Sequence, residues 1–143
     1  MDCQIIYYFA KKTSFCEKSL KKSLAVLDLK LSGAFFANKP EVLGERLRQA
    51  FESCDICFII GGLEFEDNRS IADIISNAAS PSAPELIRKL KNPSGSDGYL
   101  LKAGRQLLII LPDEPVQIEE IMRGEISGFI KKSTHSDYPL YNE

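Results

Sequence analysis

Short apolar segments alternate with amphipathic segments along the chain, and this alternation predicts a sheet that is covered by helices. Residues 4–9, 34–37 and 56–60 are rich in β-branched or aromatic side chains and predict three strands. Residues 56–60 are apolar throughout, which is typical of a strand that is buried on both faces of a sheet. Gly33 is expected to end the segment that precedes the second strand.

The segments between the predicted strands have the spacing of amphipathic helices. Ser14 and Glu17 have the spacing of a capping box, which predicts a helix that begins near Phe15. Pro40 suits the first turn of a second helix, where its missing N–H would have no partner. Asn68 is expected to cap a third helix. The predicted helical faces carry apolar residues at helical spacing: Phe15, Leu20, Leu24 and Leu27; Val42, Leu43, Leu47, Ala50 and Phe51; Ile71, Ile74 and Ile75.

A hairpin and two further helices are predicted in the remainder of the chain. Residues 85–90 predict a short helix. Residues 99–103 and 106–111 flank Gly104 and Arg105, which is the pattern of two strands joined by a tight turn. A last helix follows, with an apolar face of Val116, Ile118, Ile121 and Met122.

This order of elements predicts the fold class. Strands that alternate with helices, followed by a hairpin, predict a three-layer α/β/α sandwich around a mostly parallel sheet with one antiparallel strand. Residues 1–132 are expected to form a single domain, and residues 133–143 a polar tail. Ligands of such sheets bind outside the carboxyl ends of the strands. Residues 61–68 and 112–115 follow predicted strands at that edge, so they are the candidate ligand loops.

Composition excludes several classes of protein. The 143 residues include 18 Lys and Arg and 20 Asp and Glu, which gives a net charge of −2, and 44% of residues are hydrophobic. These values argue against a disordered chain and against a strongly basic nucleic-acid binder. The apolar runs are far shorter than the roughly 18 residues that span a bilayer, and Asp2 stands where a secretory signal carries bases. We therefore expect a cytoplasmic protein with no membrane or nucleic-acid partner and reduced cysteines.

Three features have simple structural interpretations. Cys54 and Cys57 form a C-x-x-C motif, but they lie between a helix end and a strand rather than at a helix N-terminus, so we expect two small core residues. His135 is expected to be a solvated residue of the tail. A basic cluster is expected to be a solvated helix face, and its members are Lys11, Lys12, Lys18, Lys21 and Lys22.

Two segments together resemble one known family. Residues 58–63 (FIIGGL), followed by acids and a Ser, resemble the glycine-glycine loop of the molybdopterin-binding domain, and residues 111–115 (LPDEP) resemble its L-P-G-x-P loop. That domain occurs in molybdopterin adenylyltransferases, in molybdopterin molybdenumtransferases and in the N-terminal part of competence/damage-inducible proteins. The resemblance covers residues 55–124 well, and it covers the N-terminal half only as an order of strands and helices.

The resemblance implies a role for named residues. In the family the glycines let backbone N–H groups approach the phosphate of molybdopterin or of a nucleotide. It therefore implies that ligand is bound by Gly61, Gly62, Ser70, Pro112, Asp113 and Pro115. Asp67 and Asn68 align with the family's paired acids and would be catalytic, with Asp67 and Glu66 holding Mg²⁺. If the protein is an enzyme, the implied reaction is adenylyl transfer to molybdopterin. The resemblance also implies a homo-oligomer, with a trimer favoured.

The departures from the family pattern leave two hypotheses open. Glu64 and Asp113 replace glycines, and residues 10–13 replace the family's acidic turn after the first strand. Five acids are expected around the cleft, and like charges a few Å apart repel by about 1–4 kcal/mol. A divalent cation would reverse that effect, since carboxylate oxygens are ligands for Mg²⁺. The protein is therefore either a divergent molybdopterin-binding-like protein that takes a pterin or a nucleotide, or a non-catalytic relative with a degenerate anion site that acts through oligomer or partner contacts.

Simpler interpretations of the same loops also remain open at this point. Gly61 and Gly62 are also typical of a tight turn between a strand and a loop. Asp67, Asn68 and Ser70 are all residue types that cap a helix N-terminus, so a capping role explains them as well as a ligand role does.

Overall fold

The computed structural model describes residues 2–80, 84–103 and 105–135, and for residues 125 and 132–135 it describes the backbone alone. One six-stranded sheet runs through the molecule in the order β2-β1-β3-β6-β5-β4. The strands are β1 (Asp2–Tyr8), β2 (Lys30–Ala37), β3 (Ile56–Ile60), β4 (Glu85–Leu90), β5 (Gly98–Ala103) and β6 (Gln106–Leu111). β5 alone runs against its neighbours, because β1, β2, β3 and β6 pair in parallel and β4 is antiparallel to β5.

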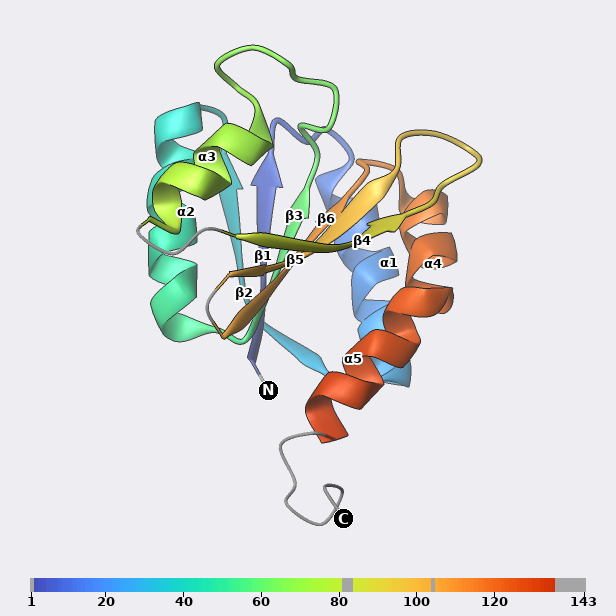
Figure 1. The fold of residues 1–143 in the computed structure, drawn as a ribbon. Helices are drawn as coiled ribbons and strands as arrows, with labels where there is room; N and C mark the ends of the chain where they lie inside the picture. The colour runs from blue at the N-terminus through green and yellow to red at the C-terminus, as the bar shows by residue number, and fades with distance from the viewer. Residues whose placement is uncertain (1, 81–83, 104, 136–143) are drawn as a thin grey trace.

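Helices cover both faces of the sheet, as Figure 1 shows. One face is covered by α1 (Thr13–Val26), α4 (Pro115–Arg123) and α5 (Glu125–His135), and the other by α2 (Pro40–Ser53) and α3 (Ile71–Ala78). The predicted three-layer α/β/α sandwich with one antiparallel strand is confirmed. No helix among residues 2–80, 84–103 and 105–135 has the length and apolar character to cross a membrane.

The alternation of side chains along the strands divides the core into two halves. In β1, Ile5 and Tyr7 pack against α1 and α4, whereas Ile6 and Tyr8 pack against α2 and α3. β3 lies in the centre of the sheet and all five of its residues are buried, as its unbroken apolar sequence predicts. The central strands are thus fixed from both sides, and the loops at their carboxyl ends are supported by a rigid base.

Residues 85–90 form a strand rather than the predicted short helix. β4 pairs with β5, with Leu86 opposite Leu101 and Lys89 opposite Tyr99. Six residues are too few for a stable helix on their own. The edge of the sheet offers β4 a full set of backbone hydrogen bonds, and this pairing is a long-range contact that local spacing does not reveal. The second strand is also longer than predicted, because Gly33 lies within β2 instead of ending the preceding segment.

The first helix begins without the predicted capping box. α1 starts at Thr13 with Lys12 as its N-cap and without a side-chain cap hydrogen bond. Glu17 instead accepts a hydrogen bond from the Tyr7 hydroxyl at 2.9 Å. Phe15 was expected on the buried face, but its side chain is 69% exposed, and Cys16 takes the buried position.

The end of the described chain packs on the sheet through a helix that the periodicity did not reveal. α5 extends to His135, so the first three residues of the expected tail at 133–143 are helical. Residues 136–143 lie outside the described residues. Ile126 and Ile130 of α5 are each 1% exposed and belong to the core beneath α4.

Truncating Ile130 therefore tests whether α5 is part of the cooperative core. We expect Ile130→Ala to lower the free energy of unfolding by about 2–5 kcal/mol, because it leaves a cavity in a packed interior. The matched control is Gly128→Ala on the same helix, where an added Cβ meets nothing within 4 Å and stability changes by no more than about 1 kcal/mol. Urea denaturation followed by circular dichroism measures both. Equal stability of Ile130→Ala and the wild type would contradict the placement of α5.

Candidate functional site

The two candidate loops meet at the carboxyl edge of the parallel strands. The Gly61 N–H donates a hydrogen bond to the Leu111 carbonyl oxygen at 3.1 Å, so the two loops leave the sheet side by side. Between them lies a hollow of about 230 Å³, which we call the polar hollow. It is lined by Gly61, Leu63, Glu64, Ser96, Pro112, Asp113, Glu114 and Gln117. The loop from β3 forms the top of the molecule in Figure 1.

Backbone geometry and packing account for both glycines. Gly61 and Gly62 have φ values of +100° and +74°, which side-chain-bearing residues rarely adopt. A Cβ at Gly61 would collide with the Tyr8 carbonyl oxygen, and a Cβ at Gly62 would collide with the Tyr8 ring. The simple interpretation of the pair as a tight turn is therefore supported by the packing alone.

Asp113 is bound to the backbone at the start of α1. Its carboxylate accepts hydrogen bonds from the N–H groups of Lys11 at 2.6 Å and Lys12 at 3.1 Å, and from the Cys16 thiol at 3.4 Å. The N-terminus of a helix presents free N–H groups and a partial positive charge, and it is a common binding place for phosphate. In this chain the protein's own carboxylate fills that place.

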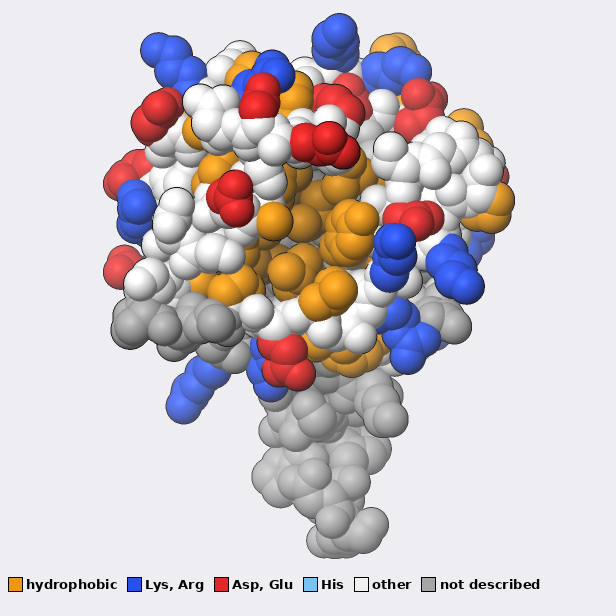
Figure 2. All heavy atoms as spheres, turned by 45° about the horizontal axis from the view of Figure 1, so that its top comes forward, with side chains coloured by type: hydrophobic (Ala, Val, Ile, Leu, Met, Phe, Trp, Pro, Cys, Tyr) orange, Lys and Arg blue, Asp and Glu red, His pale blue; other side chains and the backbone are white. Residues whose placement is uncertain are grey.

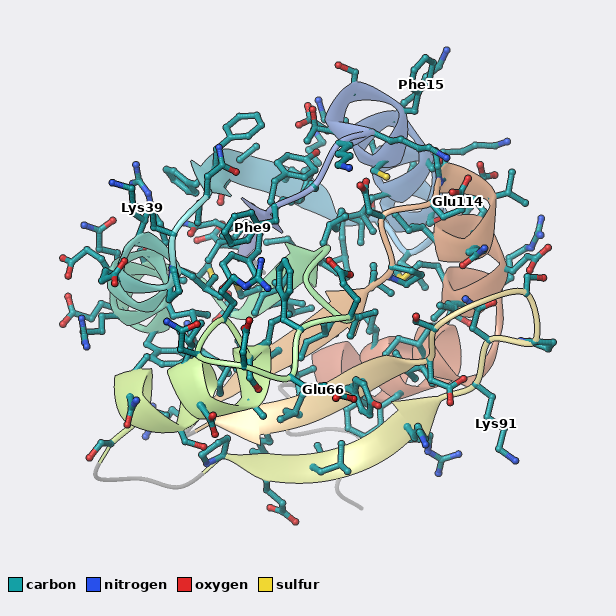
Figure 3. The ribbon with its side chains drawn as sticks, turned by 90° about the horizontal axis from the view of Figure 1, so that it is seen from above. Phe9, Phe15, Lys39, Glu66, Lys91 and Glu114 are labelled. Atoms are coloured by element: carbon teal, nitrogen blue, oxygen red, sulfur yellow. The ribbon has the colours of Figure 1, made fainter. Side chains whose placement is uncertain are left out.

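Glu114 is neutralised on the same side of the polar hollow. Its carboxylate lies 2.7 Å from the Lys12 ammonium. This ion pair connects the start of α4 to the start of α1, and Figure 3 labels Glu114 there. Burial and, to a smaller extent, the hydrogen bond to Asp113 together raise the pKa of the Cys16 thiol to about 12. Cys16 is therefore a protonated donor to Asp113 rather than a nucleophile.

Asp67 and Arg69 form a pair on the loop between β3 and α3. The Arg69 guanidinium donates to both carboxylate oxygens of Asp67, at 2.8 Å for the shortest bond, and lies over the Phe65 ring at 4.0 Å. These hydrogen bonds lower the pKa of Asp67 to about 2. Phe65 packs edge-on against Phe9 and Tyr8, so Arg69 closes a small aromatic cluster at this edge of the sheet.

The expected crowding of five acids around one cleft is wrong. Asp113 points to the α1 backbone, Glu114 pairs with Lys12 and Asp67 pairs with Arg69. Glu66 and Asp67 do not line the polar hollow, and Glu64 alone of the five lines it without an ion pair or hydrogen bond to another described residue. A phosphate would therefore be hindered mainly because Asp113 already accepts the N–H groups of Lys11 and Lys12, and less by repulsion from the other carboxylates.

A second hollow lies on the other side of the same loop. We call it the apolar hollow; its volume is about 420 Å³, and Gly62 and Ser70 line it together with mostly apolar side chains of α3, β4, β5 and β6. Figure 2 shows this apolar hollow in the centre of the face that comes forward. Ser70 is the N-cap of α3 but makes no side-chain cap hydrogen bond, and Asn68, the predicted cap, is exposed.

The structure thus divides the predicted site residues into three groups. Gly61, Pro112 and Asp113 come together around the polar hollow. Gly62 and Ser70 line the apolar hollow. The others lie away from both hollows: Glu66, Asp67 and Asn68 on the exposed loop, and Pro115 at the first turn of α4.

The donors predicted for Mg²⁺ are not arranged for a metal in this conformation. Both oxygens of Asp67 are hydrogen-bonded to Arg69. Across residues 2–80, 84–103 and 105–135, no group of three or more His, Cys, Asp or Glu side chains is placed to hold a metal ion. Magnesium binding by Asp67 and Glu66 would require the Asp67–Arg69 pair to open, so it stays a prediction.

Sequence reasoning missed Arg69 and the backbone at Lys11 and Lys12. Arg69 stands two residues after Asp67, and a short Asp-x-Arg spacing in a loop was a signal that could have indicated the pair. The five lysines of the basic cluster are exposed, as predicted, and within it Lys12 pairs with Glu114 and Lys22 pairs with Glu119 at 3.3 Å. The prediction that Cys54 and Cys57 are small core residues is confirmed, since both are buried.

Solved structures resemble this chain over nearly its whole length. A molybdenum cofactor biosynthesis protein B has a TM-score of 0.70 at 12% identity, over 100% of this chain and 97% of that one. The protein CinA from Thermoplasma acidophilum, described as having unknown function, has a TM-score of 0.69 at 14% identity, over 89% of this chain and 96% of that one. The chain has their fold. The molybdopterin biosynthesis Mog protein from Mycobacterium ulcerans also shares it, with a TM-score of 0.66 and 16% identity over 92% of this chain and 98% of that one.

The sequence comparisons add no relative. No known family matches the sequence, and no curated protein is similar to it. The solved structures, in contrast, confirm the resemblance that the two loops indicate: the chain shares the fold of molybdopterin-biosynthesis proteins, at identities of 12–16%. Identity this low shows a shared fold only, so any activity has to be argued from the residues at the carboxyl edge of the sheet.

Substituting Gly62 tests the structural requirement for the glycine pair. We expect Gly62→Ala to lower the free energy of unfolding by about 1–3 kcal/mol, because alanine is strained at positive φ and its Cβ would collide with the Tyr8 ring. Gly44→Ala is the control, since its Cβ would lie 3.8 Å from Ile74 in ordinary contact and alanine favours the helix. Thermal denaturation compares the two, and a Gly62→Ala protein as stable as the wild type would refute the packing argument.

The Asp67–Arg69 pair predicts a pH-dependent contribution to stability. The pKa of Asp67 is about 2 in the folded chain and about 4 for an unfolded Asp. The pair therefore stabilises the fold above pH 4 and loses its contribution as the pH falls toward 2. We expect the stability difference between the wild type and Asp67→Asn to shrink between pH 5 and pH 2 in urea denaturation. A difference that does not change over this range would show that the pair contributes nothing.

Proposed function

We propose that this protein binds a pterin- or nucleotide-type small molecule at the carboxyl edge of its sheet, in a role related to molybdenum cofactor biosynthesis. The observation that carries the proposal is the meeting of two loops, 50 residues apart in sequence at Gly61 and Leu111, around one polar hollow. The solved structures with this fold include proteins named for molybdenum cofactor and molybdopterin biosynthesis. Ligands of open α/β sheets bind at this edge.

The free carboxylate of Glu64 suits the ring of such a ligand. Glu64 lines the polar hollow and makes no hydrogen bond or ion pair with another described residue. A pterin presents an amino group and a neighbouring ring N–H, and an ionised carboxylate accepts two such donors at once. Ser96 and Gln117 line the same hollow and add uncharged hydrogen-bonding groups for ring nitrogens or hydroxyls.

A phosphate on the ligand competes with Asp113. The N–H groups of Lys11 and Lys12 are the donors at the start of α1 that a phosphate would use, and Asp113 accepts from both. A phosphorylated ligand has to displace this carboxylate, whereas a phosphate-free pterin does not. We therefore expect the protein to prefer ligands without phosphate.

The same contact supports a second candidate, in which the anion site is degenerate and the protein acts through oligomer or partner contacts. Asp113 satisfies the N–H groups internally, and Asp67, a predicted catalytic residue, is held by Arg69. Neither residue is then available for phosphate binding or for adenylyl transfer. In this case the trimeric assembly that the resemblance implies would be the functional form, and the polar hollow would bind neither ligand class.

Substituting Asp113 distinguishes the two candidates. The probes are neopterin, a phosphate-free pterin, and ATP with Mg²⁺, each titrated by calorimetry. We expect the wild type to bind neopterin and to bind ATP at least about tenfold more weakly than Asp113→Gly does, since that variant frees two N–H groups for a phosphate. Asp113→Asn keeps a side-chain oxygen at the N–H groups, so it gains little ATP binding.

A matched control separates occupancy from charge. Glu114→Gln removes one negative charge from the same hollow and leaves Asp113 in place. A gain of ATP binding in Asp113→Gly but not in Glu114→Gln supports the occupied-site explanation. Absence of neopterin binding in the wild type would overturn the ligand-binding candidate, and absence of both ligands in Asp113→Gly as well would leave the degenerate site as the explanation.

A further inference from the structure

The apolar hollow lies where the sheet has no helix above it. α2 and α3 are the helices on this face, and α3 has only eight residues and packs beside α2. The strands farthest from α2, which are β5 and β4, carry Tyr99, Leu101 and Leu86 on this face without a helix to cover them. Figure 1 shows β4 and β5 in front of the molecule, with α3 to one side.

The residues that line the apolar hollow are uncharged, and those at its base are almost fully buried. Ile71, Ile75 and Ile110 at its base are 5%, 0% and 4% exposed, and Leu86 at its mouth is 57% exposed. No Lys, Arg, Asp or Glu lines it. An uncharged apolar surface of this kind favours apolar over ionic ligands, because a charge would lose its hydration there without gaining a partner.

Two aromatic rings and two hydroxyls complete the lining. Phe65 stands on the loop from β3, and Tyr99 stands on β5. The hydroxyls of Ser70 and Tyr99 make no hydrogen bond with any described residue, so each is available to a ligand. A cavity that is mostly apolar with a few polar groups has the composition of a small-molecule site, and its volume of about 420 Å³ is adequate for one small ligand.

We propose that the apolar hollow is a second ligand site, which binds an uncharged aromatic or heteroaromatic ring compound. The ring packs against Phe65 and Tyr99, and a polar atom of the ligand bonds with the Ser70 or Tyr99 hydroxyl. Leu86 is exposed at the mouth, whereas Ile71 and Ile110 keep only 5% and 4% of their surface exposed yet line the hollow, so a small molecule inside it would contact them and a flat protein surface would not. Gly62 and Ser70, which the resemblance implies bind ligand, line this hollow, but it lies on the opposite side of the loop from the polar hollow, so its test does not depend on binding in the polar hollow.

A neutral fluorescent probe tests this site directly. N-phenyl-1-naphthylamine has two uncharged aromatic groups and an N–H, and its emission rises when it leaves water. We expect it to bind the wild type in a saturable way, with one site per chain. 8-Anilinonaphthalene-1-sulfonate has the same rings and a sulfonate, and it should bind at least about tenfold more weakly, because no cation lines the hollow and the nearby Arg69 is already paired with Asp67.

A filling variant places the bound probe. Ala72 lines the apolar hollow from an exposed position on α3, so Ala72→Trp fills the hollow without changing the core. We expect it to weaken probe binding at least about tenfold. Ala25→Trp is the matched control, since Ala25 is exposed on α1, across the sheet, and should leave binding unchanged.

A second pair of variants tests the same site independently, in case Ala72→Trp does not fold. Leu86→Lys introduces a charge at the mouth of the hollow and should also weaken binding, while Val116→Lys, at a similarly exposed apolar position on α4, should not. Equal probe binding in Ala72→Trp, Leu86→Lys and the wild type would overturn the proposal. An absence of saturable probe binding by the wild type would also overturn it. If sedimentation then showed an oligomer that Ala72→Trp dissociates, a second copy of the chain would be the occupant of this face.

Discussion

The arrangement of the carboxyl edge depends on one hydrogen-bonded contact, that of the Asp113 carboxylate with the backbone N–H groups of Lys11 and Lys12. It joins segments about one hundred residues apart in sequence and brings the start of α4 against the start of α1. Charge-assisted bonds of this kind are about twice as strong as neutral ones. The same contact fixes the loop after β6 and satisfies the donors that an external anion would use, so structure and ligand preference follow from a single side chain.

The loop from β3 divides the edge into two environments of different polarity. On one side, Glu64 faces hydrogen-bonding groups between the two loops, and on the other, Phe65 faces a base of buried isoleucines. Gly61 and Gly62 make this division possible, since only residues without a Cβ can follow the turn that passes so close to Tyr8. The Asp67–Arg69 pair then holds the far end of the loop beneath the aromatic cluster.

Much of the fold could be predicted from the sequence, because the central strands are strongly apolar and the helices between them have clear spacing. β3 and the turn at Gly61 are examples, and both are local features. β4 could not be predicted, since its strand conformation depends on pairing with β5. At the site, the loops and their meeting were predictable from motifs, but the partners of Asp113 and Asp67 were not: a carboxylate is identified as free or satisfied only when its neighbours in space are known.

The order of strands in the sheet also has a consequence for folding. β4, β5 and β6 are consecutive in the chain and adjacent in the sheet, so their pairing closes only short loops. The parallel pairs β1–β3 and β3–β6 enclose whole helices or the antiparallel strands, and such distant contacts lose more chain entropy when they form. We therefore expect the meander of β4, β5 and β6 to form before the parallel pairs. Both hollows are bounded by the loop from β3, so neither is complete until β3 has paired with β6.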